Sequence, residues 1–330
     1  MGGDLSLARL PHASRSGVLS AAPLVSIVIP TRNGGARLRQ LFGAIASQRT
    51  DFQTEVVVVD SGSSDGTTDF LAARVAQLIR IDPGSFDHGA TRNLGVSKTR
   101  GTFVVLMVQD AVPVNDRWLA SLVDPLRREP GLAATFARQV PTEDASPLTR
   151  HYLARWIAAG SDPRAVFVPS ETEFAALSPI ERFERSVVDN VCAAIRRSVW
   201  AAIPFRSTPI AEDLEWGREA LLAGHGLAYV PDAVVEHSHD RSAWYELKRT
   251  WVLHQQLHRL FGLRTVPTVG RLASAIGGSL ALHQRELSKA RAPFTAYLRG
   301  AALAVAWPVG QYVGGWTAAS GHFDWRPRGV

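Results

Sequence analysis

The first third of the chain alternates short apolar runs with segments of helical periodicity. The runs VSIVIP (25–30) and EVVVVD (55–60) are continuous, which is typical of strands buried on both faces of a parallel sheet. Between them, ARLRQLFGAIASQ (36–48) spaces its apolar residues as one face of a helix does. The same alternation predicts two further strands, at 78–82 and 103–109, with a helix at 90–99 between them. Strands that alternate with helices predict an α/β fold, with a doubly wound, mostly parallel sheet flanked by helices.

The second half of the chain is less regular, and from residue 242 its pattern becomes helical. A strand pattern covers 227–240, where Pro231 indicates an edge position or a bend. The segment 190–200 fits a strand, or a strand that leads into a helix, and 141–186 holds a helix and a proline-containing loop. The remaining predicted elements are helices at 116–128 and 211–224 and a strand at 132–139. A C-terminal helical extension therefore follows the predicted sheet.

Composition is that of a globular protein and narrows the choice of partners. The chain has 330 residues, 46% hydrophobic and 20% charged, enough for one large domain or two ordinary ones. The formal net charge is +6, and nearly all basic side chains are arginines, which suit planar contacts with phosphate. A nucleotide substrate or an anionic membrane surface is therefore a candidate partner. No zinc-finger spacing, basic run or RNA-binding aromatic pattern occurs, so we expect no nucleic-acid partner.

Cysteine usage and the N-terminal segment bear on the compartment. Cys192 is the one cysteine and lies in an apolar segment, so we expect a buried structural thiol and a reducing compartment. Residues 1–23 lack periodicity and lack the apolar core of a secretory signal, so they are expected to form a flexible leader. A cytoplasmic location is the expectation.

Polar side chains follow three of the predicted strands directly, at Thr31-Arg32-Asn33, at Asp60-Ser61 and at Gln109-Asp110. The carboxyl ends of parallel strands meet at one crevice, where open α/β sheets place their ligands. The alternative for Asp110 is an N-cap of the next helix. Neither a GxGxxG nor a GxxxxGK[ST] pattern occurs, which disfavours the dinucleotide fold and the P-loop.

Several motifs in a fixed order resemble one enzyme family. VSIVIPTRNGG followed by EVVVVDSGSSDGT resembles the amino-terminal half of family 2 glycosyltransferases, which have the GT-A fold. FDHGATRNLG, GTFVVLMVQDAVPVNDRWL, AEDLEW and LLAGHGLAYVPDAVVEHSHD are similar to the rhamnosyltransferase-like branch. The resemblance covers about residues 24–250 and implies transfer of a sugar from a nucleotide diphosphate to an acceptor hydroxyl, with Mg²⁺ or Mn²⁺ as cofactor.

The resemblance also implies a domain organisation. A GT-A catalytic domain would occupy 24–245, with a nucleotide-sugar half (24–115) and an acceptor half (116–245). Residues 246–330 would form a helical, membrane-associating region.

The residues that match the family's donor-binding positions come from five segments. Asp60 would accept a hydrogen bond from the pyrimidine base, and its alternative is an Asx-turn. Arg92 would make charge-assisted hydrogen bonds to the diphosphate, and its alternative is a solvated helix residue. The full set implied by the resemblance is Pro30, Thr31, Arg32, Asp60, Asp87, His88, Arg92, Asn93 and Gln109.

A metal site is implied at Asp110, which matches the metal-binding acid of the family's usual D-x-D. Here Val108 and Gln109 stand where other members carry acids, so one carboxylate remains. His237 and His239 fall where some members supply a histidine ligand, and in a strand both would face one side. The alternative is a structural pair, and His237 is the preferred ligand. A metal that depends on the donor phosphates is the resulting hypothesis.

The acidic pair in AED (211–213) opens a predicted helix and matches the family's catalytic acids. Asp213 would be the general base that deprotonates the acceptor hydroxyl, so that its attack inverts the configuration of the sugar. Glu212 is the rival base, and the simpler alternative is an acidic helix N-terminus stabilised by the helix dipole. Trp216 would stack on a sugar or belong to the core, and Asn190 would face the acceptor.

The resemblance implies dTDP-L-rhamnose as donor and a cell-surface polysaccharide or lipid-linked glycan as acceptor. The alternatives are another nucleotide sugar, or a non-catalytic binding module. In the tail, no charged residue lies between Arg299 and Asp324. A helical hairpin on the inner face of the plasma membrane, with Trp307 and Trp316 near headgroups, is preferred over a membrane-spanning helix. A pair of helices that forms an oligomer is the remaining alternative.

Overall fold

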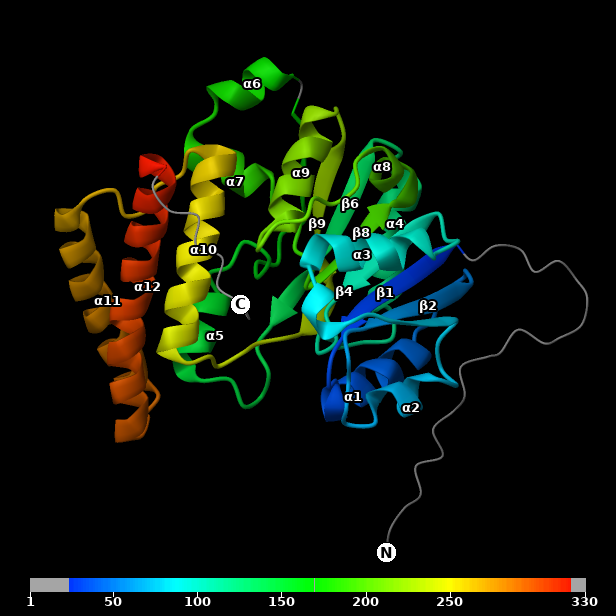
Figure 1. Cartoon of the computed structure of the whole chain (residues 1–330), viewed down its shortest axis with the longest axis horizontal. Helices are drawn as coiled ribbons and strands as arrows, with labels where there is room; N and C mark the ends of the chain where they lie inside the picture. The colour runs from blue at the N-terminus through cyan, green and yellow to red at the C-terminus, as the bar shows by residue number, and fades with distance from the viewer. Residues whose placement is uncertain (1–23, 169, 322–330) are drawn as a thin grey trace, which may run out of the picture.

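The computed structural model describes residues 24–168 and 170–321 (Figure 1). The predicted leader, 1–23, lies outside the described residues. Within them, one nine-stranded sheet runs in the order β3-β2-β1-β4-β8-β6-β9-β5, and β7 pairs with β9 beyond this path. The sheet carries the loops of the candidate site.

The first half of the sheet is parallel. Its strands follow the apolar runs of the sequence, because residues such as Ile27 and Val58 are completely buried on one face and Val28 and Val57 on the other. The strands are β1 (Val25–Thr31), β2 (Thr54–Asp60), β3 (Gln77–Arg80) and β4 (Phe103–Met107). The helices between them are α1 (Gly35–Ala46), α2 (Thr67–Leu71) and α3 (His88–Ser97). The short 3-10 turn η1 (Pro83–Ser85) precedes α3.

The second half of the sheet is mixed. Strand β8 (Cys192–Arg196) is antiparallel to both β4 and β6 (Leu132–Val140), whereas β6 is parallel to β9 (Gly226–Glu236). The short strands β5 (Val112–Pro113) and β7 (Arg164–Val166) are antiparallel to β9. The mixed, mostly parallel sheet flanked by helices confirms the predicted fold class. Cys192 begins β8 and is buried.

Strand β9 agrees with its prediction at Pro231 and differs from it at its C-terminal end. Its register with β6 jumps from the pair Ala137–Val230 to the pair Arg138–Val234, so Pro231 lies in a bulge and the bend is correct. The strand ends at Glu236, four residues earlier than predicted. His237 and His239 therefore lie in irregular chain, and the strand geometry expected for them is wrong.

Helices cover both faces of the sheet and enclose two apolar cores. One core packs α1, α2 and α4 (Trp118–Arg128) against one face. The other packs α3, α8 (Arg197–Ala202), α9 (Glu212–Leu222) and the end of α10 (Ala243–Phe261) against the opposite face. The segment predicted as one helix and a loop holds three helices besides β7, namely α5 (Pro147–Leu153), α6 (Glu171–Ala176) and α7 (Pro179–Arg185).

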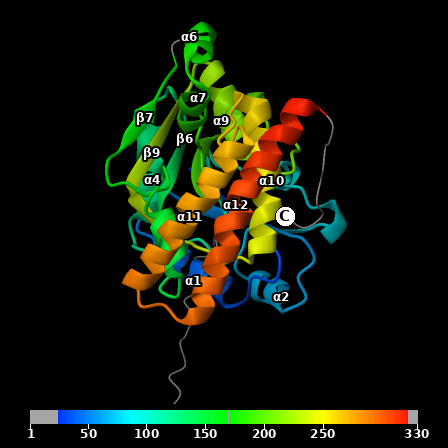
Figure 2. The same ribbon diagram turned by 90° about the vertical axis from the view of Figure 1, so that its left-hand side faces the viewer.

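The C-terminal region is helical, as predicted, and lies along one side of the molecule (Figure 2). It consists of α10 (Ala243–Phe261), α11 (Val269–Lys289) and α12 (Phe294–Ser320). Helix α12 approaches α10 closely at Gly310 and Gly314, where an added Cβ would lie 2.9 Å from the Leu247 carbonyl oxygen and 2.3 Å from that of Trp251. Across the described chain, we find no helix with the length and apolar character that crossing a bilayer requires.

Candidate active site

A cleft of about 1210 Å³ opens at the carboxyl ends of strands β1, β2, β4 and β9. Ten of the predicted site residues line it, namely Pro30, Thr31, Arg32, Asp87, His88, Arg92, Gln109, Asp110, His237 and His239. Six others are not among the lining residues, namely Asp60, Asn93, Asn190, Glu212, Asp213 and Trp216. The cleft also takes in Arg241 and Val252 from the C-terminal side, which the sequence analysis did not single out.

Gln109 holds the loop that follows β1. Its Oε1 accepts hydrogen bonds from the Thr31 hydroxyl (2.5 Å) and from the Arg32 backbone N–H (2.9 Å). Its Nε2 donates to the Arg32 carbonyl oxygen at 3.1 Å. A carboxylate could only accept, so an amide is the group that bonds both backbone groups of Arg32. This is a physical reason for glutamine where the family usually has an acid.

Asp60 forms the Asx-turn that was its alternative. The side chain is 1% exposed, and its Oδ1 accepts from the backbone N–H of Gly62 (3.1 Å) and of Ser63 (3.0 Å). Its Oδ2 accepts from the Ser63 hydroxyl. These bonds shape the loop after β2, and contact with a base stays a prediction.

Two predicted donor residues anchor the start of α3. Asp87 caps the helix by accepting from the Ala90 N–H (2.8 Å), and its other oxygen accepts from Ser207 (2.7 Å). Burial lowers the pKa of His88, which keeps its ring neutral at pH 7.

Asn93 does not reach the cleft. Its Nδ2 donates to the Phe205 carbonyl oxygen at 2.7 Å, and its Oδ1 accepts from Trp200 Nε1 at 2.8 Å and from the Phe205 N–H at 3.1 Å. Because both ends of the amide are bonded to the protein, the structure gives Asn93 a structural role in place of the expected donor contact.

Arg92 is buried, so the solvated-helix alternative is wrong. It is 4% exposed, and its Nη1 lies 2.5 Å from Oε1 of Glu212, which is 5% exposed. Its buried Nε has no hydrogen-bond partner within the described ranges. Burial favours neutral Glu212, but the charges of Arg92 and His88 outweigh it and hold the pKa of Glu212 below its usual value. Glu212 is thus the counter-ion of an arginine that faces the cleft.

Asp213 lies beside this ion pair, and its pKa is shifted in the opposite direction from that of Glu212. Its Oδ2 accepts from the Asn190 N–H at 3.1 Å, and part of its surface is accessible. Burial, followed by the charges of Glu212 and Asp189, raises the pKa of Asp213 to about 8. Ala211 precedes the pair with a positive φ of 66°, which opens helix α9 at Glu212. Of the two adjacent acids, one is ionised and one holds its proton at neutral pH.

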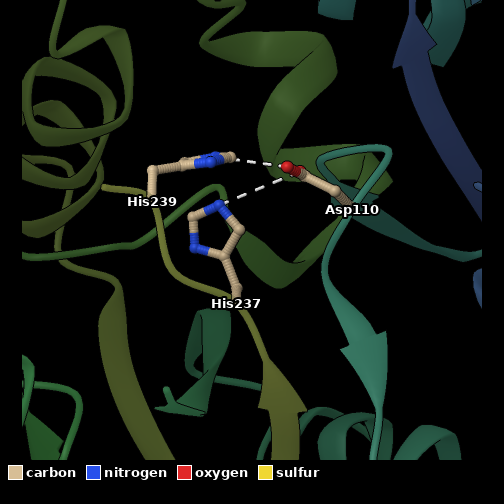
Figure 3. A group of neighbouring side chains, drawn as sticks. All are labelled: Asp110, His237 and His239. Atoms are coloured by element: carbon tan, nitrogen blue, oxygen red, sulfur yellow. Dashed lines mark ion pairs between the residues drawn. The ribbon is translucent and has the colours of Figure 1, made fainter. Parts of the chain in front are cut away.

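Asp110, His237 and His239 converge at the end of the cleft (Figure 3). Their candidate ligand atoms all lie within 4.8 Å of one another. His239 Nε2 is 3.2 Å from Oδ2 of Asp110, and His237 Nε2 is 3.8 Å from Oδ1. Helix α4 is capped at Arg117, so the N-cap alternative for Asp110 is wrong.

The donor set of this triad fits a divalent metal. Burial lowers the pKa of His237 to about 4, so the imidazole is neutral and offers a lone pair at pH 7. Although burial opposes the charge on Asp110, the hydrogen bond and charges of the histidines hold the pKa of its carboxyl below the usual value. One carboxylate and two imidazoles leave further positions for phosphate oxygens and water, which Mg²⁺ and Mn²⁺ prefer.

Residues that the sequence analysis missed support the triad. His237 Nδ1 lies 3.2 Å from Oε1 of Gln139, whose Nε2 donates to Oδ2 of Asp189 at 2.5 Å. With the Nδ1–H directed to Gln139, the Nε2 lone pair is left for a metal. Arg37 of α1 pairs with Glu236 (2.9 Å) and so fixes the end of β9. The only sequence signal was that Gln139 is a polar residue at the end of an apolar strand.

Trp216 belongs to the core. It is 2% exposed, its Nε1 donates to the Ile203 carbonyl oxygen at 2.7 Å, and its ring packs on Phe205. The expected stacking on a sugar is wrong for this residue. Asn190, 1% exposed, positions both acids, because its Nδ2 also lies 3.4 Å from Glu212 Oε1.

These features define the class as an α/β protein with a ligand cleft and a candidate metal site at its strand ends. The family model for glycosyl transferase family 2 matches residues 26–203, more than half of the chain. The chain therefore belongs to glycosyl transferase family 2, which confirms the resemblance. It is a glycosyltransferase that uses a nucleotide-sugar donor and a glycan acceptor.

Two curated relatives are O-antigen chain rhamnosyltransferases, WbaN of Salmonella anatum and RfbN of Salmonella typhimurium. Each is 32% identical over 70% of this chain and 72% of its own length. Among solved structures, the mannosyltransferase PcManGT from Pyrobaculum calidifontis, in complex with GDP-Man and Mn²⁺, aligns with a TM-score of 0.48 and 19% identity. That alignment covers 93% of this chain and 77% of the other.

Proposed function

We propose that the chain is an inverting rhamnosyltransferase. It transfers L-rhamnose from dTDP-L-rhamnose to a hydroxyl of a cell-surface polysaccharide or a lipid-linked glycan. The observation that carries the mechanism is a pair of adjacent acids, of which Glu212 is paired with Arg92 while Asp213 is not and has a raised pKa. The names of the two 32%-identical relatives support the choice of sugar. Residues 24–245 would form the catalytic domain and 246–330 the accessory helical region.

Asp213 is the base in this proposal. Its raised pKa gives its carboxylate a strong affinity for a proton, and part of its surface is open to an acceptor. In its deprotonated form it takes the proton of the acceptor hydroxyl while that oxygen attacks the anomeric carbon. Glu212 is less suited to this role because its pairing with Arg92 lowers its pKa and so weakens its affinity for a proton. The attack comes from the face opposite to the departing diphosphate, which inverts the anomeric configuration.

The donor lies along the cleft from the loop after β2, which begins at Ser61, to the triad. The loop Pro30–Arg32 encloses the nucleotide, and Arg92 directs its positive charge at the diphosphate. Asp110, His237 and His239 would hold Mg²⁺ or Mn²⁺, which when bound supplies positive charge to the leaving diphosphate.

A panel of nucleotide sugars tests the function. Release of nucleoside diphosphate should be fastest with dTDP-L-rhamnose and slower with UDP-glucose, UDP-N-acetylglucosamine and GDP-mannose. A different preferred donor would replace rhamnose by that sugar. Binding of a donor without any turnover, with or without Mn²⁺, would instead favour the non-catalytic module.

The C-terminal helices support contact with an anionic membrane. The outer face of α12 exposes Phe294 (75%), Leu298 (59%), Val305 (43%) and Trp316 (50%), which recur at the spacing of one helix face. Basic residues of the adjacent helix α11 are exposed as well, for example Arg271. We propose that this face contacts the inner face of the plasma membrane.

Trp307, also expected near headgroups, is not on this face. It packs on Tyr152 and donates to Glu246 at 3.1 Å. In sedimentation with phosphatidylglycerol vesicles, Leu298→Ser should weaken binding, and salt should weaken it further. The control Ile180→Ser, an exposed apolar residue of α7, should bind as the parent does.

A further inference from the structure

Trp156 is an exposed aromatic residue to which neither the sequence analysis nor the mechanism assigns a role. It lies in the turn after α5 and is 37% exposed. Its Nε1 donates to Oδ2 of Asp189 at 2.9 Å, so the ring is held by its polar edge. A tryptophan fixed in this way presents an apolar surface at little loss of conformational freedom on binding.

The anchor of Trp156 lies next to the candidate base. Asp189 precedes Asn190, whose backbone N–H bonds Asp213. The ring of Trp156 and the acid that we propose to meet the acceptor hydroxyl are therefore held by two residues that are adjacent in the chain.

The same anchor reaches the triad. Oδ2 of Asp189 accepts from both Trp156 and Gln139, and Gln139 bonds His237. One carboxylate oxygen thus positions an exposed ring on one side and a metal-ligand candidate on the other. A ring placed by chance on the surface would not share its hydrogen-bond acceptor with the site.

We propose that the face of Trp156 is the platform on which the ring of the acceptor sugar stacks. The axial C–H groups of a pyranose are apolar and fit an indole face, while its hydroxyls remain free to reach Asp213. This inference rests on the proposed function and specifies its acceptor side. Asp189 is a positioning residue in this arrangement.

Direct binding tests the platform without turnover. The nine tryptophans are replaced by fluorotryptophan, and the Trp156 fluorine NMR signal is assigned by its loss in Trp156→Phe. The protein is saturated with dTDP and Mg²⁺ and titrated with the methyl glycosides of rhamnose, galactose, glucose and mannose. The Trp156 signal should shift with at least one of them. A signal that none of the four sugars shifts overturns the proposal.

Kinetics with the sugar that shifts the signal provides the second test. Trp156→Leu should raise the acceptor KM about tenfold, because the aromatic surface for the sugar ring is lost. The donor KM and the hydrolysis of donor by water should not change. Phe167→Leu, at another exposed aromatic residue, should leave all of these values unchanged. A loss of donor hydrolysis in Trp156→Leu would make the ring structural and overturn the proposal.

The Asp189→Asn variant separates the anchor from the ring. It should raise the acceptor KM and also weaken Mn²⁺ binding measured by calorimetry. Trp156→Leu should raise the acceptor KM and leave Mn²⁺ binding unchanged. If Asp189→Asn changes neither value, the shared anchor is refuted. Failure of the proposed function would appear differently, as a wild-type protein that hydrolyses no nucleotide sugar.

Discussion

The proposed donor side and the proposed acceptor side of the site are built by different physical means. On the donor side, Gln109 and Asp60 shape the loops through hydrogen bonds to nearby backbone groups. On the acceptor side, Glu212, the buried counter-ion of the donor-facing Arg92, lies beside a protonated Asp213. Hydrogen bonds thus set the shape of the donor-side loops, and nearby charges and burial set the protonation states of the acceptor-side acids. Substitutions should therefore act on binding on one side and on chemistry and pH response on the other.

The largest effect is expected from Asp213→Asn. Loss of a general base should lower kcat by about 10²–10⁴-fold, while donor binding is retained. The measurement is the initial rate of sugar transfer together with the affinity for dTDP. Near-normal turnover in this variant, with turnover abolished in Glu212→Gln, would assign the base to Glu212 instead.

Asp213→Asn, which should lower activity, should raise the thermal stability of the protein near pH 8. Because the pKa of Asp213 is raised to about 8 in the fold, the native state holds a proton that the unfolded chain releases near pH 4. Native stability from this group therefore declines as pH rises between these values. Asparagine carries no such charge, so the Tm of the variant should exceed that of the parent near pH 8 and match it near pH 4. An equal Tm at both values of pH would contradict the raised pKa.

The next effect concerns the ion pair. Glu212→Gln leaves Arg92 buried without its counter-ion, which should lower the free energy of unfolding by about 3–5 kcal/mol. Urea denaturation measures this change. The double variant Arg92→Met with Glu212→Gln should recover part of the loss, because no uncompensated charge remains. A double variant no more stable than the single one would show that the pair is not the cause.

The pH dependence of the wild-type rate gives a smaller effect. The base must be deprotonated to act, so kcat/KM should fall about tenfold per pH unit below the pKa of Asp213, near 8. Rates measured with saturating metal report this limb. A rate independent of pH down to about pH 5 would mean that Asp213 ionises normally.

The smallest effect is expected on the donor side, at Gln139. Removal of a residue that orients a metal ligand typically lowers affinity by about 10–100-fold, and Gln139→Leu should lie at the low end because one histidine of two is affected. Mn²⁺ binding in the presence of dTDP, measured by calorimetry, gives the value. Gln284→Leu on the exposed face of α11 is the control. Unchanged Mn²⁺ affinity in Gln139→Leu would remove Gln139 from the support of the triad.

The two sides also differ in how far the sequence predicts them. The strands that carry the donor side appear as continuous apolar runs, and a polar cluster follows each run directly in the sequence. Because these strands are parallel, their polar ends meet at one edge of the sheet, and this convergence can be predicted. The acceptor side depends on residues that are distant in sequence, as Glu212 and its counter-ion Arg92 are separated by 120 positions. Their burial and pairing depend on antiparallel β8 and on α9, whose placement no local pattern specifies.

Trp216 and Trp156 illustrate the same limit. Both are tryptophans near polar residues, and helical spacing beside an acidic pair favoured Trp216 as the sugar contact. The fold buries Trp216 against Phe205 and leaves Trp156 exposed. The fate of each ring depends on which long-range neighbours pack over it, and periodicity contains no information on that.

The close approach of α12 to α10 at Gly310 and Gly314 has a consequence for engineering. The two glycines let the backbones approach closely, and the inner side chains Trp307 and Thr317 bond to α10, so the position of α12 is fixed without its outer residues. Phe294, Leu298, Val305 and Trp316 can therefore be exchanged as a set while the inner face keeps the helix in place. The outer face of α12 is a site at which the enzyme can be immobilised on a support with its cleft unaltered.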